Sequence, residues 1–134
     1  MVVDTSVVLH VAFAEPGWEG SVAFLLSQQS RLVAAPSVVE AQAVLAGRTR
    51  VGSFEVLQEL VGDLMLEVVP FTVRQAGLAQ AAYLTYGKGQ GHRAQLNYGD
   101  VLSYALAKDR REKLVFVGDD FNHTDLDSVR LPLE

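Results

Sequence analysis

Acidic side chains that could bind a metal ion occur at four places that lie far apart along the chain. They are Asp4, Glu40, Asp100 and the adjacent pair Asp119 and Asp120. If these acids converge in the folded protein they must repel one another, because two carboxylates about 5 Å apart repel by about 3 kcal/mol at an effective dielectric constant of about 20. Such a cluster is stable only where the acids are partly protonated or are neutralised by a bound cation.

The cation that best suits such a cluster is Mg²⁺ or Mn²⁺, because the ligands are oxygens and neither histidine nor cysteine accompanies them. An ion of this kind can position a phosphodiester, activate a water molecule and stabilise the leaving oxygen. Asp4 and Asp100 would be the principal ligands. Glu40 and Asp120 would hold water molecules, a second ion or the attacking water. The chemistry that these residues permit is therefore hydrolysis of a phosphodiester bond.

The predicted secondary structure would bring the acids to one edge of a sheet. Short apolar runs alternate with longer segments of helical period, which predicts an α/β domain with a mainly parallel sheet. The expected strands are 1–3, 32–35, 66–69, 114–117 and a short last strand at 129–131. The expected helices are 6–14, 18–29, 37–46, 54–64, 73–86 and 98–108. Since ligands bind beyond the carboxyl ends of parallel strands, Asp4 and the Asp119–Asp120 pair should share one rim.

Two of the acids also have a purely structural explanation. Ser37 and Glu40 have the spacing of a capping box at the start of a helix. Asn97 and Asp100 have the spacing of an N-cap followed by an acid at the third helical position, where the helix dipole favours negative charge. Taken singly, each acid is more often a cap than a ligand, and only their convergence would favour a metal site.

Composition limits the class of protein. The chain has 134 residues, of which 49% are hydrophobic and 20% charged, and this fits a single domain over residues 1–134. The absence of cysteine excludes a disulfide framework and thiolate metal sites. A net charge of −5 excludes a strongly basic surface for nucleic acid. No apolar run approaches the roughly 20 residues of a membrane span, so we expect a cytoplasmic protein that does not bind membranes.

Four short motifs follow one another over nearly the full length of the chain. They are Val3-Asp4-Thr5-Ser6, Pro36-Ser37-Val38-Val39-Glu40, Leu96-Asn97-Tyr98-Gly99-Asp100 and Val117-Gly118-Asp119-Asp120-Phe121. In this order they resemble the motifs of PIN-domain ribonucleases, and within that family the VapC-type toxins of bacterial toxin–antitoxin pairs. The N-Y-G-D and G-D-D-F segments, after V-D-T-S near the start, are the specific part of the resemblance.

The resemblance implies a three-layer α/β/α PIN-like fold, an acidic cluster that binds Mg²⁺ or Mn²⁺, and endonucleolytic cleavage of RNA. The acids of the family fall on Asp4, Glu40, Asp100 and the Asp119–Asp120 pair, of which Asp120 is the preferred member. Asp125 is a weaker candidate for the same rim. The resemblance also implies a cognate VapB-type antitoxin, whose C-terminal segment covers the acidic groove, and a homodimer.

Substrate contacts can be assigned to two segments. Thr5 or Ser6 would hydrogen-bond a ligand carboxylate or a substrate phosphate, although capping of a helix is equally open. Residues 87–92 are rich in glycine and predict a flexible loop. Lys88 and Arg93 in and beside this loop would guide the RNA backbone, or would simply be solvated, and Arg48 and Arg50 form a second basic candidate.

A different class of function is also compatible with these residues. The chain could be a non-catalytic PIN-like module that binds RNA or a protein partner, with its acids serving only as helix caps. Metal binding distinguishes the two hypotheses, because a module of that kind has no use for a divalent cation.

Overall fold

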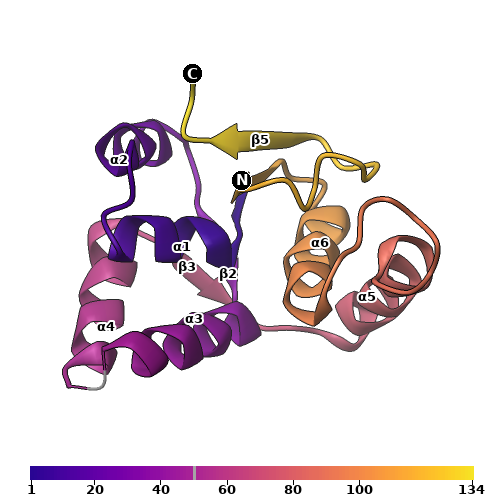
Figure 1. The fold of residues 1–134 in the computed structure, drawn as a ribbon, viewed down its shortest axis with the longest axis horizontal. Helices are drawn as coiled ribbons and strands as arrows, with labels where there is room; N and C mark the ends of the chain where they lie inside the picture. The colour runs from indigo at the N-terminus through magenta and orange to yellow at the C-terminus, as the bar shows by residue number, and fades with distance from the viewer. Residues whose placement is uncertain (50) are drawn as a thin grey trace.

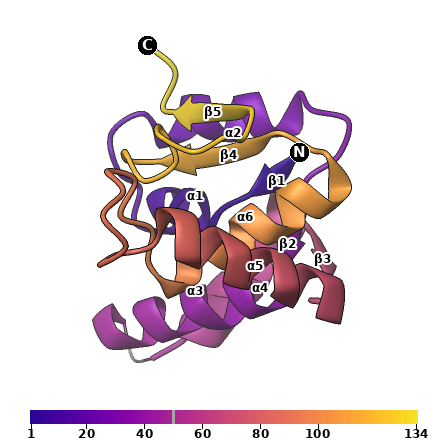
Figure 2. The same cartoon turned by 90° about the vertical axis from the view of Figure 1, so that its right-hand side faces the viewer.

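A computed structural model describes residues 1–49 and 51–134, so Arg50 of the second basic candidate lies outside the described residues. Within that part of the chain, five parallel strands form one sheet (Figure 1), in the order β3-β2-β1-β4-β5 that the labels of Figure 2 show. They are β1 (Val2–Val3), β2 (Leu32–Ala34), β3 (Glu67–Val69), β4 (Leu114–Val117) and β5 (Ser128–Leu131). The predicted parallel sheet is confirmed, including its short last strand.

The helices connect the strands and cover both faces of the sheet. They are α1 (Thr5–Ala12), α2 (Trp18–Leu26), α3 (Ala35–Arg48), α4 (Ser53–Asp63), α5 (Val73–Tyr86) and α6 (Tyr98–Arg110). Helices α5 and α6 pack on one face, in front of the sheet in Figure 2, and α1 to α4 pack on the other. This is the predicted three-layer α/β/α arrangement. Among the described residues, no helix has both the length and the apolar character needed to cross a bilayer.

Successive residues of the central strands enter two separate apolar cores. Val2 and Leu114 belong to the core beneath α5 and α6, whereas Val3, Val33 and Val115 belong to the core beneath α1 to α4. Neighbouring side chains of a strand point to opposite faces, so a strand covered on both sides needs apolar residues at every position. This is why the strands read as continuous apolar runs in the sequence.

The start of α3 differs from the prediction. The expected strand ended at residue 35 and the expected helix began with a capping box of Ser37 and Glu40. Instead β2 ends at Ala34 and α3 begins at Ala35 without a side-chain capping bond. Pro36 lies in the first turn, where its restricted φ suits the start of a helix. The capping box was therefore wrong, and Glu40 lies in the second turn of α3.

Candidate active site

Asp4 lies at the junction of the central strand β1 and helix α1. Its Oδ2 atom accepts hydrogen bonds from the Ser6 backbone N–H at 3.0 Å and from the Ser6 hydroxyl at 2.6 Å, so it caps α1. The Ser6 hydroxyl in turn accepts a hydrogen bond from the backbone N–H of Val117 at 3.0 Å. Ser6 therefore ties the carboxylate of Asp4, which is only 4% exposed, to the carboxyl end of the neighbouring strand β4.

Asp100 combines a capping role with a buried position among other acids. It forms a capping box with Asn97, in which each side chain accepts from the other residue's backbone N–H at 2.9 Å, as predicted. Burial raises the pKa of Asp100 to about 7, against the opposing effect of the Asn97 hydrogen bond. The charges of Asp120, Asp4 and Glu40 raise the pKa of Asp100 further. Three acids from other segments of the chain therefore act on the buried Asp100.

Glu40 reaches the start of α6 from α3. Its carboxylate lies against the Cα atom of Gly99, where even a methyl group would overlap it. The Thr5 hydroxyl donates a hydrogen bond to the Ser37 carbonyl at 3.3 Å and so joins the first turn of α1 to the first turn of α3. The turn that carries Glu40 follows directly along α3.

The two acids that follow β4 have different surroundings. Asp120 is exposed to solvent, but its partial burial raises its pKa, and so do the charges of Asp4 and, to a lesser extent, Asp119. Asp119 is 77% exposed, forms an ion pair with Arg130 of β5 at 3.2 Å and accepts a hydrogen bond from the Asn122 side chain at 3.2 Å. The structure thus brings Asp120 toward Asp4 and holds Asp119 beside Arg130. The preference for Asp120 as a ligand stays a prediction.

Of the predicted basic residues, Lys88 is the one near the acids. Its positive charge lowers the pKa of Asp120, against the effects of burial and of Asp4. The segment that carries Lys88 is closed at its base, because the Lys88 N–H donates to the Leu96 carbonyl and the Leu96 N–H to the Tyr86 carbonyl, each at 2.9 Å. Arg93 is exposed farther along this segment, and its charge is not among those that shift the pKa of Asp100 or Asp120.

Arg48, the described member of the second basic candidate, points elsewhere. The guanidinium of Arg48 lies over the ring of Phe13, 4.3 Å from its centre, at the far end of α3 from the acids. A cation in this position stabilises the local packing of an aromatic ring. It supplies no basic surface beside the acids.

The donor set suits a hard divalent cation in its chemistry. All four side chains offer carboxylate oxygens, and their mutual repulsion at Asp100 is the kind that a bound cation relieves. As the side chains stand, no three acid or histidine groups of the described residues surround one point closely enough to form a coordination sphere. The residues therefore fit Mg²⁺ or Mn²⁺ in the type and charge of their donors, and they share one electrostatic environment without meeting at one point.

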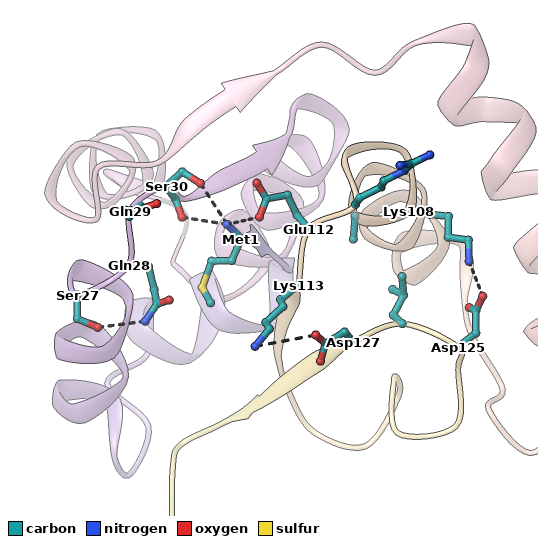
Figure 3. A pocket seen from close by; sticks show the side chains of 13 residues that line it. Met1, Ser27, Gln28, Gln29, Ser30, Lys108, Glu112, Lys113, Asp125 and Asp127 are labelled. Atoms are coloured by element: carbon teal, nitrogen blue, oxygen red, sulfur yellow. Dashed lines mark hydrogen bonds and ion pairs between the residues drawn. The ribbon is translucent and has the colours of Figure 1, made fainter.

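A concave region lies at the end of the sheet opposite to the acids (Figure 3). It is a hollow of about 900 Å³ next to the residues that precede the strands, among them Met1, Ser30, Lys113 and Asp127. Three ion pairs join residues that line it: the Met1 amine with Glu112 at 3.1 Å, Lys108 with Asp125 at 2.6 Å, and Lys113 with Asp127 at 3.9 Å. The prediction that Asp125 belongs to the acidic rim was wrong, because the return of the chain to β5 carries it to this end.

The fold and the acids define a class of protein, an α/β/α domain with acidic side chains at the carboxyl ends of its parallel strands. Comparison with known proteins assigns the chain to a family of this class. The model of the PIN domain family matches residues 1–126. Ribonuclease VapC28 of Mycobacterium tuberculosis is 42% identical over 124 residues, which cover 92% of this chain and 93% of that protein. The chain therefore belongs to the PIN-domain family and, within it, to the VapC ribonucleases.

Solved structures show the same fold at much lower sequence identity. VapBC2 from Rickettsia felis, bound to a DNA fragment from its promoter, matches with a TM-score of 0.77 and 13% identity over 96% of both chains. A toxin–antitoxin complex from Klebsiella pneumoniae matches with a TM-score of 0.68 and 15% identity, over 96% of this chain and 94% of that one. At these identities the likeness establishes the fold alone.

Sequence reasoning missed one residue next to the acids. The sequence indicates Gly99 only as a member of the N-Y-G-D motif, yet the Glu40 carboxylate lies against this residue. A glycine inside a predicted helix is unfavourable for the helix, and this was the available signal that the position has another purpose.

Proposed function

We propose that the protein is a metal-dependent endoribonuclease that hydrolyses RNA phosphodiester bonds with Mg²⁺ or Mn²⁺ at the acidic site. Asp4 and Asp100 would hold the cation, and Glu40 and Asp120 would complete the site. The observation that carries this proposal is the raised pKa of Asp100, on which the charges of the three other acids act from three other segments of the chain. The relationship to VapC ribonucleases supports RNA as the substrate class.

The mechanism follows from what each acid can do. A bound cation would neutralise the carboxylates, lower the pKa of a water molecule and stabilise negative charge on the leaving oxygen. Ser6 holds Asp4 in orientation, and the Asn97 N–H does the same for Asp100. Because burial and the Asp4 charge raise the pKa of Asp120, its carboxylate is a better proton acceptor for the attacking water than an ordinary aspartate.

The RNA backbone would approach from the segment that carries Lys88. The Lys88 ammonium is close enough to Asp120 to lower its pKa, and from there it can contact a phosphate next to the acids. Arg93 would guide the strand farther out. The hydroxyls of Thr5 and Ser6 already bond to the Ser37 carbonyl and to Asp4, so we assign them to holding the acids in place rather than to binding RNA.

The partners of the proposed nuclease are a VapB-type antitoxin and a second copy of the chain, acting together in the cytoplasm. The likeness to a toxin–antitoxin complex supports an antitoxin. An arginine from such a partner, inserted among the carboxylates, would neutralise them as a cation does. Stoichiometric addition of the neighbouring gene product should therefore abolish cleavage, and unchanged cleavage would contradict this part of the proposal.

The test is incubation of the purified protein with a panel of structured RNAs, including tRNAs, in Mg²⁺, Mn²⁺ or EDTA. We expect metal-dependent cleavage that is lost in Asp4→Asn and Asp100→Asn. Cleavage should be retained in Asp63→Asn, which removes an exposed acid at the end of α4. Absence of cleavage, together with a melting temperature that neither metal changes, would instead favour the non-catalytic binding module.

A further inference from the structure

Gly99 lies in the first turn of α6, next to Asp100, and its missing side chain leaves room for Glu40. The three heavy atoms nearest to the place of a Cβ atom all belong to the Glu40 carboxylate, with Cδ at 2.5 Å and Oε1 at 2.8 Å, and Oε2 overlaps that place outright. A real Cβ atom essentially never comes so close to another heavy atom. Any larger residue at position 99 would therefore have to displace the carboxylate.

The backbone gives no other reason for a glycine at this position. Gly99 is an ordinary residue of α6, and it is not among the glycines with positive φ. Within a helix, glycine is among the least favourable residues, and alanine would be better. Glycine at this position therefore lowers the helix propensity of α6, and its lack of a side chain leaves the space that Glu40 fills.

Other helical glycines of the chain differ in this respect. Gly62 in α4 and Gly77 in α5 have no atom within 4 Å of the place where a Cβ atom would lie. Alanine at either position meets open space. They are matched controls for the same substitution in the same kind of backbone.

We infer that Gly99 is a positioning residue for Glu40: it allows the carboxylate from α3 to lie beside Asp100 and so to join the acidic site. This inference rests on the proposed function for the role of Glu40. Moving the carboxylate away from α6 removes one of the charges that act on Asp100. A side chain at position 99 therefore affects the acidic site only by displacing the Glu40 carboxylate. It should have no such effect in a variant that lacks this carboxylate.

The test is a double-mutant cycle of wild type, Gly99→Ala, Glu40→Ala and the double variant, with Gly77→Ala as the control. Mn²⁺ binding is measured from the electron paramagnetic resonance of the free ion, alongside metal-dependent RNA cleavage. We expect Gly99→Ala and Glu40→Ala each to weaken Mn²⁺ binding about ten- to a hundredfold, the loss typical of a disturbed ligand environment. The double variant should bind no more weakly than Glu40→Ala, and Gly77→Ala should bind like the wild type.

Two results would overturn the inference. One is Mn²⁺ binding in Gly99→Ala that equals the wild type. The other is a double variant in which the two losses multiply, because independent residues give additive free energies. If Gly99→Ala does not fold, circular dichroism of the double variant decides, since removal of the Glu40 carboxylate should restore folding. A double variant that also fails to fold contradicts the inference.

Failure of the proposed function can be told apart from failure of this inference. A wild-type protein that neither cleaves RNA nor binds Mn²⁺ overturns the proposed function. The contact between Glu40 and Gly99 is then tested by melting temperatures alone. Alanine favours a helix, so Gly99→Ala should raise the melting temperature in the Glu40→Ala background and raise it less, or lower it, in the wild-type background, where the Glu40 carboxylate must move. An equal change in both backgrounds would show that Gly99 does not act through Glu40.

Discussion

The hydroxyl of Ser6 donates a 2.6 Å hydrogen bond to the carboxylate of Asp4 and accepts a 3.0 Å hydrogen bond from the backbone N–H of Val117. Through this one side chain, the acid that follows β1 is held against the end of β4. The chain thus fixes Asp4 without help from a ligand, because the same carboxylate also caps α1. Preorganisation of this kind reduces what a cation must do to assemble its ligands.

Substitution of Ser6 by alanine should disturb both the fold and the site. It removes a hydrogen bond to a charged group and leaves the Val117 N–H without its acceptor, so we expect the free energy of unfolding to fall by about 2 kcal/mol. RNA cleavage should fall about tenfold as Asp4 loses its orientation. The control is Ser103→Ala, because the buried Ser103 hydroxyl has no partner among the described residues. Equal unfolding free energies for wild type and Ser6→Ala in urea titrations would contradict the proposed link.

Asp100 makes the stability of the metal-free protein dependent on pH. Its pKa rises from 3.8 to about 7 in the folded state. The folded protein therefore favours the protonated carboxyl. Its contribution to the free energy of unfolding is complete below pH about 4 and is lost as the pH rises through about 7. Asp100→Asn keeps the side chain neutral, so it should stabilise the metal-free protein at pH 8 by about 2 to 4 kcal/mol. At pH 4 the two proteins should differ little.

Urea unfolding in EDTA at both pH values measures this effect. Addition of Mg²⁺ or Mn²⁺ at pH 8 should then raise the melting temperature of the wild type and leave Asp100→Asn nearly unchanged, because the variant lacks a principal ligand. If the free energies of unfolding of the wild type and Asp100→Asn differ by the same amount at pH 4 and at pH 8, Asp100 is not held in its protonated form.

Much of the fold could be predicted from local patterns. Strands buried on both faces give unbroken apolar runs, and Asn97 with Asp100 marks the start of α6 as a capping box should. The start of α3 could not be predicted from the Ser37 and Glu40 spacing, since that spacing is the same whether or not the serine caps the helix. Pro36 was the competing signal, because it can occupy the first turn of a helix that begins before Ser37.

The site was less predictable than the fold, because its details depend on packing between distant segments. The parallel topology alone indicates that Asp4 and one acid after Gly118 share a rim. Nothing local says which acid lies nearer to Asp4, since both are exposed to solvent; Arg130, from the next strand, forms an ion pair with Asp119. The contact between Glu40 and Gly99 likewise depends on how α3 packs against α6.

The two neighbouring acids after β4 should differ sharply in their contribution to cleavage. Asp120 is the one whose pKa is raised by burial and by Asp4, so Asp120→Asn should lower the cleavage rate at least about a hundredfold, as loss of a proton acceptor does. Asp119→Asn should retain the rate within about threefold, because it breaks an exposed ion pair worth at most about 1 kcal/mol. Single-turnover cleavage rates at saturating Mn²⁺ measure both. The opposite order of effects would assign the site to Asp119.

Lys88 should contribute to RNA binding through its charge and not through the metal. Lys88→Ala removes the cation that lowers the pKa of Asp120, and with it one contact to a backbone phosphate. We expect the logarithm of the RNA affinity to depend less steeply on the logarithm of the salt concentration, by about 0.7 for a single-stranded segment. Mn²⁺ binding should not weaken, since removing a neighbouring positive charge cannot repel a cation.

Fluorescence anisotropy with RNA in EDTA at several salt concentrations measures the slope, with Lys113→Ala at the opposite end of the sheet as the control. An unchanged slope in Lys88→Ala, or an equal decrease in both variants, would mean that this segment does not guide the substrate.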